Sequence, residues 1–139
     1  MKIVMIFGTF DIVHCGHLHM FREAKEYGGK LIAVVGRDAN VEKVKGFLPI
    51  HNEKERLFLV ENIKLVDQAV LGDKTDVYKV IEKFKPDIIA LGYDQKMYVD
   101  ELAEAITKFG LKTRIVKLKP YHENQYKSSK IKKYIERIV

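Results

Sequence analysis

Residues 8–17 read GTFDIVHCGH, and this stretch decides how the rest of the chain is interpreted. An apolar run at residues 3–7 precedes it, and an amphipathic segment at residues 18–27 follows it. The order predicts a buried strand, a tight turn and a helix. A helix N-terminus that follows such a turn presents backbone N–H groups to an anion, so the stretch is a candidate phosphate site.

Two histidines strengthen this interpretation. His14 and His17 are three residues apart, so on a helix that begins near His14 their rings project from one side of its first turn. Gly8 lets the backbone turn sharply, and Gly16 removes the side chain that would block a close ligand. Two imidazoles at a helix N-terminus can stabilise the negative charge that develops on a reacting phosphate.

Other interpretations of the stretch are weaker. No Gly-Lys-Ser/Thr follows, so it is not a Walker loop, and it lacks the GxGxxG of dinucleotide-binding folds. Cys15 and His19 could join the two histidines in a zinc site, but no second ligand cluster at zinc spacing occurs elsewhere. The residues alone leave two readings open, a phosphate site and an ordinary strand-turn-helix without catalytic use.

The motif GTFDxxHxGH resembles the signature of the small nucleotidyltransferases similar to glycerol-3-phosphate cytidylyltransferase. The likeness covers nearly the whole chain. It continues through segments that stand where such enzymes carry nucleotide contacts, namely Lys45-Gly46, Glu55-Arg56, Leu91 to Lys96 and Ser128 to Ile131. Within this group, the Gly-x-Asp-Gln-Lys stretch and the chain length are most like the archaeal-type FAD synthetases, which transfer AMP from ATP to FMN.

The resemblance implies catalytic roles for four residues. His14 and His17 would contact the α-phosphate and donate hydrogen bonds that strengthen in the transition state. Lys45 would contact the triphosphate, and Arg56 would reach a phosphate of the nucleotide or the acceptor as a bidentate donor.

Asp11 and Arg56 each have an alternative. Asp11 could bind Mg²⁺ together with the phosphates, or it could cap the start of the following helix. Arg56 could instead form a surface ion pair with Glu53 or Glu55.

The expected nucleotide-binding residues lie in the turn, at a strand end and at the start of the last helix. The turn would offer backbone amides, the strand end would approach the base or ribose, and two serines would offer hydroxyls to a phosphate while capping their helix. These residues are Gly8, Thr9, Phe10, Asp11, His14, Gly16, His17, Gly92, Tyr93, Asp94, Ser128 and Ser129.

One departure from the cytidylyltransferase pattern bears on the substrates. Those enzymes carry an Arg-Thr-Glu-Gly run before the Ser/Thr pair, whereas residues 122–125 here are His-Glu-Asn-Gln. With the Asp-Gln-Lys of residues 94–96, this favours transfer of AMP from ATP to FMN, giving FAD and pyrophosphate by direct in-line attack without a covalent intermediate. The alternatives are a CTP-dependent cytidylyltransferase acting on glycerol phosphate or a related alcohol phosphate, and a non-catalytic nucleotide-binding module.

Alternating apolar and amphipathic segments predict the fold class. Strands at short spacing from helices indicate right-handed βαβ units. We therefore expect an α/β, Rossmann-like, doubly wound five-stranded parallel sheet with helices on both faces, formed by a single domain, residues 1–139. Predicted strands cover residues 2–7, 31–36, 66–72, 86–92 and 113–118, and predicted helices include 17–27, 75–84, 99–109 and 128–138.

Composition argues against a nucleic-acid-binding protein and against a membrane protein. The net charge is +6, but Arg and aromatic residues are not clustered, so nucleic-acid binding is not favoured. The sequence contains no run of about 18 apolar residues, so no membrane span is predicted. The single cysteine and the lack of a signal-peptide pattern fit a cytoplasmic protein. The resemblance further implies Mg²⁺ and a homodimer.

Overall fold

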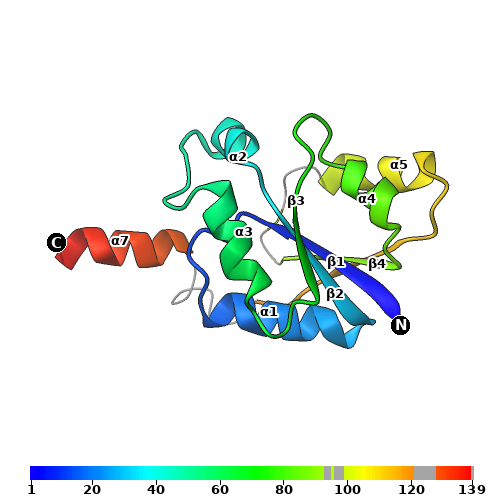
Figure 1. Cartoon of the computed structure of the whole chain (residues 1–139), viewed down its shortest axis with the longest axis horizontal. Coiled ribbons are helices and arrows are strands. Elements are labelled where there is room, and N and C mark those ends of the chain that lie inside the picture. The colour runs from blue at the N-terminus through cyan, green and yellow to red at the C-terminus, as the bar shows by residue number, and fades with distance from the viewer. Residues whose placement is uncertain (93–94, 96–98, 121–127, 139) are drawn as a thin grey trace.

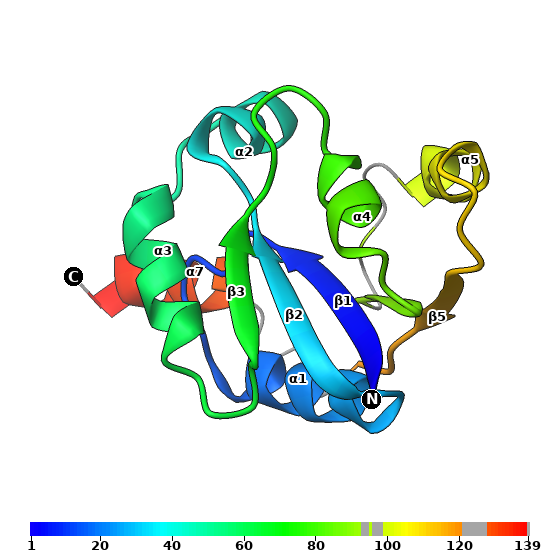
Figure 2. The same cartoon turned by 45° about the vertical axis from the view of Figure 1, so that its right-hand side comes forward.

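The computed structural model describes residues 1–92, 95, 99–120 and 128–138. Its centre is a five-stranded sheet in the order β3-β2-β1-β4-β5, with every neighbouring pair parallel (Figures 1 and 2). The strands are β1 (Lys2–Gly8), β2 (Gly29–Val35), β3 (Gln68–Leu71), β4 (Ile88–Leu91) and β5 (Arg114–Lys117). The predicted five-stranded parallel sheet is confirmed.

The central strand shows why the apolar runs are continuous. Val4 of β1 lies opposite Leu31 of β2 on one side and Ile88 of β4 on the other. Helices cover both faces of this parallel sheet, so successive side chains of a strand are buried whichever way they point. Accordingly Val4, Met5 and Ile6 are all at most 1% exposed.

The helices form two layers, as predicted. On one face, Phe21 of α1 and Val60 of α3 pack with Val4 and Ile6 of β1. On the other face, helices α4 and α5 supply the buried residues Val80, Ile81, Leu102 and Ile106. The helices are α1 (Cys15–Glu26), α2 (Asp38–Lys45), α3 (Glu53–Glu61), α4 (Lys79–Phe84), α5 (Val99–Lys108) and α7 (Ser128–Ile138).

Helix α4 is shorter than the helix predicted over residues 75–84. The Asp73 carboxylate accepts hydrogen bonds from the amides of Thr75 and Asp76, and the Asp76 carboxylate accepts one from the Tyr78 amide. These side-chain contacts satisfy the backbone in a turn and compete with helix formation. The helix therefore starts at Lys79.

The carboxyl ends of the strands bring distant residues together. The Gly36 amide donates to the Gly8 carbonyl oxygen at 2.9 Å, and the Gly72 amide donates to that of Val35 at 2.9 Å. Ligands of open parallel sheets bind at this edge. Helix α7 projects beyond the sheet (Figure 1). Among the described residues, no helix is long and apolar enough to cross a membrane.

Candidate active site

The two motif histidines close the N-terminus of α1. His14 is the N-cap residue, and its ring Nδ1 accepts a hydrogen bond from the Gly16 amide at 3.1 Å. His17 reaches back, so that its Nδ1 accepts from the His14 amide at 3.2 Å. This reciprocal pair is a capping box made of imidazoles in place of the usual Ser/Thr and Glu. It places the ring centroids 4.1 Å apart.

The capping box also fixes where each ring carries its proton. A backbone N–H can only donate, so both Nδ1 atoms must accept, and a neutral imidazole then carries its hydrogen on Nε2. Burial lowers the pKa of His14 below the ordinary value, which favours the neutral ring. Because the Gly16 amide already donates within the protein, the Nε2–H groups become the expected donors to a phosphate.

In the turn before α1, the residue with a positive φ is Phe10 and not Gly8. Phe10 has φ 54°, a left-handed conformation that costs a residue with a side chain about 1–2 kcal/mol. Its ring is buried and meets the His17 ring edge-on, with centroids 5.8 Å apart. A Cβ added at Gly8 would lie 2.6 Å from the Phe10 ring. The expectation that Gly8 makes the turn is therefore wrong, because its role is to leave room for Phe10.

Asp11 anchors the turn to the segment before α3. Its carboxylate accepts from the amides of Ile50 and His51, each at 2.9 Å, and pairs with the Lys132 ammonium of α7. Burial of this 5%-exposed residue by itself raises the pKa, but the hydrogen bonds from His51, Lys132 and Ile50 outweigh it. The pKa of Asp11 is lowered to about 2. The prediction that Asp11 caps the helix is wrong, because the cap is His14.

The contacts of Asp11 do not fit a Mg²⁺ ligand. Both oxygens accept from N–H donors, and one of them carries the Lys132 ammonium. A hard cation needs oxygens that are open to it. Across the described part of the chain, no group of three or more His, Cys, Asp or Glu side chains is placed to hold a metal ion.

Arg56 lies inside the protein instead of on its surface. It is 0% exposed, and its guanidinium donates to the Thr9 carbonyl at 2.7 Å and to the His51 carbonyl at 3.0 Å. It also forms an ion pair with Asp38 at 2.6 Å. The sequence interpretations placed this side chain either at a phosphate or in an exposed pair with a neighbouring glutamate. The structure shows it joined to protein groups, so the exposed pair is wrong.

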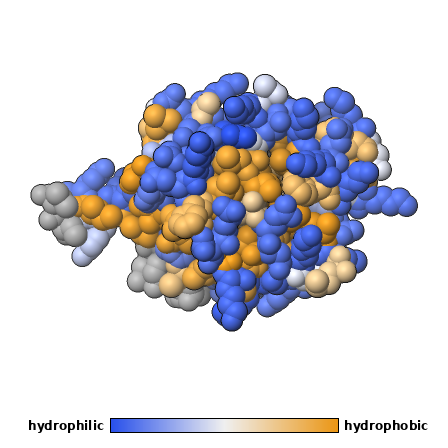
Figure 3. All heavy atoms as spheres, in the orientation of Figure 1, coloured by the Kyte–Doolittle hydropathy of each residue, from blue (hydrophilic) through white to orange (hydrophobic). Residues whose placement is uncertain are grey.

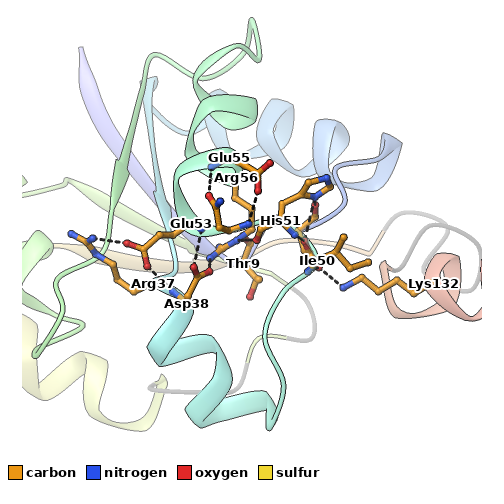
Figure 4. Close-up of polar contacts among 11 residues, drawn as sticks. Thr9, Arg37, Asp38, Ile50, His51, Glu53, Glu55, Arg56 and Lys132 are labelled. Atoms are coloured by element: carbon orange, nitrogen blue, oxygen red, sulfur yellow. Dashed lines mark hydrogen bonds and ion pairs between the residues drawn. The ribbon is translucent and has the colours of Figure 1, made fainter.

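Glu53, three residues before Arg56 on α3, has other partners. Glu53 accepts from Arg37 at 2.8 Å and from the Asp38 amide at 3.0 Å, while the Glu53 amide donates to the Asp38 carboxylate at 3.1 Å. The Asp38 amide, followed by Arg37, lowers the pKa of Glu53. Each helix N-terminus, of α2 and of α3, thus receives the carboxylate of the other, which suits their positive ends (Figure 4).

The structure also places most of the remaining predicted residues. Lys45 is exposed and ends α2, just before Gly46 in a left-handed conformation. Gly16 lies in the first turn of α1, and Gly92 follows β4. Ser128 and Ser129 begin α7. Tyr93 and Asp94 lie outside the described residues.

Asp38, His51 and Lys132 were not predicted to belong to the site. They contact Arg56 and Asp11, and these contacts join residues 18 to 121 positions apart in the chain. An acidic residue in the first turn of a helix, like Asp38, is also typical of an ordinary helix start. No local pattern singles out the other two.

The assembled geometry is suited to acting on a phosphate. Two imidazoles with Nε2–H donors lie side by side at the carboxyl edge of a parallel sheet. A buried arginine and a buried aspartate hold the turn that carries them. Fixed donors of this kind stabilise charge that develops on a reacting oxygen.

Known proteins resemble this chain over nearly its whole length. The family model described as cytidylyltransferase-like matches residues 5–134. The FAD synthase of Aciduliprofundum boonei is 46% identical, over 97% of this chain and 91% of that protein. The FAD synthase of Archaeoglobus profundus is 47% identical, over 98% and 85%.

Solved structures share the fold. A crystal structure titled lipopolysaccharide core biosynthesis protein, from Thermoplasma volcanium, superimposes with a TM-score of 0.80 at 43% identity, covering 86% of this chain and 98% of that one. Pantoate-beta-alanine ligase from Francisella tularensis, at 15% identity and a TM-score of 0.63 over 95% and 65%, shows the fold alone. With a family model over nearly its whole length and these close relatives, the chain belongs to the cytidylyltransferase-like family and is a nucleotidyltransferase.

Proposed function

We propose that this chain transfers the AMP group of ATP to FMN and so forms FAD and pyrophosphate. Relatives named FAD synthase match 92–100% of it at 41–47% identity. The single observation that carries the proposal is the imidazole capping box of α1, which aligns two donors in a chain that matches these relatives nearly end to end.

The proposed reaction is one direct displacement. A phosphate oxygen of FMN attacks the α-phosphorus of ATP, and the bond from that phosphorus to the oxygen bridging to the β-phosphate breaks as pyrophosphate leaves. Such a transfer needs positioning and charge stabilisation rather than a protein nucleophile. His14 and His17 donate from Nε2 to the α-phosphate oxygens, and these hydrogen bonds strengthen as charge builds up.

Other contacts complete the proposed substrate site. Lys45 contacts the triphosphate, and the strand end at Gly92, with Tyr93 and Asp94, approaches the base or ribose. Ser128 and Ser129 offer their helix start to a phosphate. Dependence on Mg²⁺ and a cytoplasmic location remain predictions, and Asp11 supplies no metal ligand in this mechanism.

The association of two copies is part of the proposal. Large apolar side chains are exposed on α3, on the loop before it and on α7: Phe58, Leu59, Phe47, Leu48, Ile50, Tyr134 and Ile135. Apolar atoms follow α7 and continue over the part of the face where α3 lies (Figure 3). Contiguous exposed apolar surface commonly marks an interface, so this surface supports a homodimer.

Four reaction mixtures test the activity. Pyrophosphate release is measured with Mg²⁺ for ATP or CTP, each with FMN or glycerol 3-phosphate, and FAD is identified by chromatography. We expect release only with ATP and FMN, together with an equal amount of FAD. Release with CTP and glycerol 3-phosphate instead would establish the cytidylyltransferase alternative, and ATP binding with no release from any pair would favour the non-catalytic module.

A further inference from the structure

The conformation of Phe10 needs support from its surroundings. Its φ of 54° lies in the left-handed region, where a residue with a side chain is strained. The buried ring touches that of Phe21, with centroids 5.5 Å apart, and meets the His17 ring edge-on at an interplanar angle of 68°. The orientation of His17 therefore depends on Phe10 staying where it is.

The residues on both sides of Phe10 are held by a pair of side chains at the start of α3. Arg56 donates to the Thr9 carbonyl at 2.7 Å. The His51 ring Nδ1 lies 2.9 Å from the Asp11 carbonyl oxygen, which can only accept, and the His51 amide donates to the Asp11 carboxylate. Figure 4 shows these side chains converging on the turn from the α3 side.

Arg56 also contacts His51 directly. Its Nε donates to the His51 carbonyl at 3.0 Å. The same guanidinium therefore contacts both Thr9, which precedes Phe10, and His51, which contacts the residue after Phe10. The third contact, with Asp38, compensates the charge of this fully buried side chain. Because the guanidinium is 0% exposed and all three of its nitrogens donate inside the protein, a phosphate could reach it only if this arrangement opened.

We propose that Arg56 is a positioning residue: through the Thr9 carbonyl it holds Phe10 in its left-handed conformation, and through the Phe10 ring it orients His17 for catalysis. His51 acts with it from the other side of Phe10. The kinetic part of this inference rests on the proposed function, whereas the orientation of the histidine ring can be measured without any substrate.

Arg56→Lys is the direct test, because it keeps a positive charge beside Asp38 but loses the planar fork that spans three acceptors. Val60→Ala is the matched control, since Val60 is equally buried on the same helix and its side chain belongs to the apolar core. We expect Arg56→Lys to lower kcat at least about 10-fold while the KM for ATP changes less than about 3-fold. Val60→Ala should keep kcat within about 2-fold at a temperature where both variants are folded.

A spectroscopic measurement separates positioning from stability. The ¹⁵N shifts of the His17 ring report which nitrogen carries the proton, and the structure assigns it to Nε2. Without substrate, Arg56→Lys should move these shifts toward a mixture of the two tautomers, and Val60→Ala should leave them unchanged. This readout holds even if FMN proves not to be the acceptor.

A milder variant covers the case in which Arg56→Lys does not fold. His51→Ala removes only the ring, which is 41% exposed, and should lower kcat in the same direction with the same movement of the His17 shifts. The proposal is overturned if these shifts are unchanged in both variants. It is equally overturned if Arg56→Lys raises the KM for ATP more than about 10-fold at unchanged kcat, which would place the guanidinium on a phosphate.

Discussion

At the scale of single residues, His14 links protein structure to the pH at which the site works. Burial lowers its pKa, and the Gly16 amide needs Nδ1 as an acceptor. Adding a proton to Nδ1 sets two N–H groups against each other and opens the cap. In the proposed mechanism the neutral ring is thus the working form.

The predicted consequence is that the acid limb of the pH–rate profile lies at lower pH than the titration of an ordinary histidine. We expect kcat/KM for ATP to stay level through neutral pH and to fall only below about pH 6.5, the usual histidine pKa. Steady-state rates between pH 4.5 and about 8 provide the check, with the exposed His19→Ala as the control. An acid limb centred above pH 7 would contradict this assignment.

Asp11 makes the corresponding prediction for stability. Its pKa in the folded chain is lowered from 3.8 to about 2, so the carboxylate stabilises the fold fully above the unfolded value and loses that contribution as pH falls toward the folded one. Asp11→Asn should cost about 2 kcal/mol of unfolding free energy at pH 7. The difference from the unmodified chain should shrink between about pH 4 and pH 2 in urea titrations. A constant difference over that range would mean that the carboxylate charge is not the cause.

At the scale of elements, an ion pair ties α7 to the motif. Lys132 reaches Asp11 across 121 positions of sequence. Lys132→Ala removes this tie, so amide hydrogen exchange in α7 should become several-fold faster. Lys133→Ala, next to it and exposed, should leave exchange unchanged. Equal exchange in both variants would show that other contacts hold the helix.

The elements themselves could largely be predicted from sequence, because the buried strands β1, β2 and β4 are continuous apolar runs that end at or just before a glycine. The helix start at Lys79 could not, since it depends on the local contacts of Asp73 and Asp76. The strand, turn and helix of the motif could be predicted in the same way, but its cap could not, because His14 and not Asp11 closes the helix.

The internal contacts of the site lay beyond sequence reasoning. Nothing local shows that Phe10 rather than Gly8 carries the positive φ, or that Arg56 is fully buried. An arginine in the first turns of an amphipathic helix is usually exposed. Its position here results from the packing of α2 and α3, whose N-termini share Asp38 and Glu53.

At the scale of the whole molecule, the exposed apolar surface predicts a homodimer formed through α3 and α7. Phe58→Glu and Ile135→Glu should each convert it to a monomer in light scattering at micromolar concentration, because a buried unpaired charge opposes association. Ile115→Glu is the control, since Ile115 is exposed on β5, at the opposite edge of the sheet from β3. A monomeric unmodified chain, or dissociation only by Ile115→Glu, would contradict this interface.

In the whole molecule, the proposed function depends on the capped histidine pair, which carries adenylyl transfer to FMN. The most direct measurement is the rate of FAD formation at saturating ATP and FMN for His17→Ala beside His19→Ala. We predict a loss on the order of 100-fold for His17→Ala and a change within about 2-fold for His19→Ala, because in the proposed mechanism His17 donates to the reacting phosphate and His19 does not. FAD formation by His17→Ala at the unmodified rate would contradict the claim.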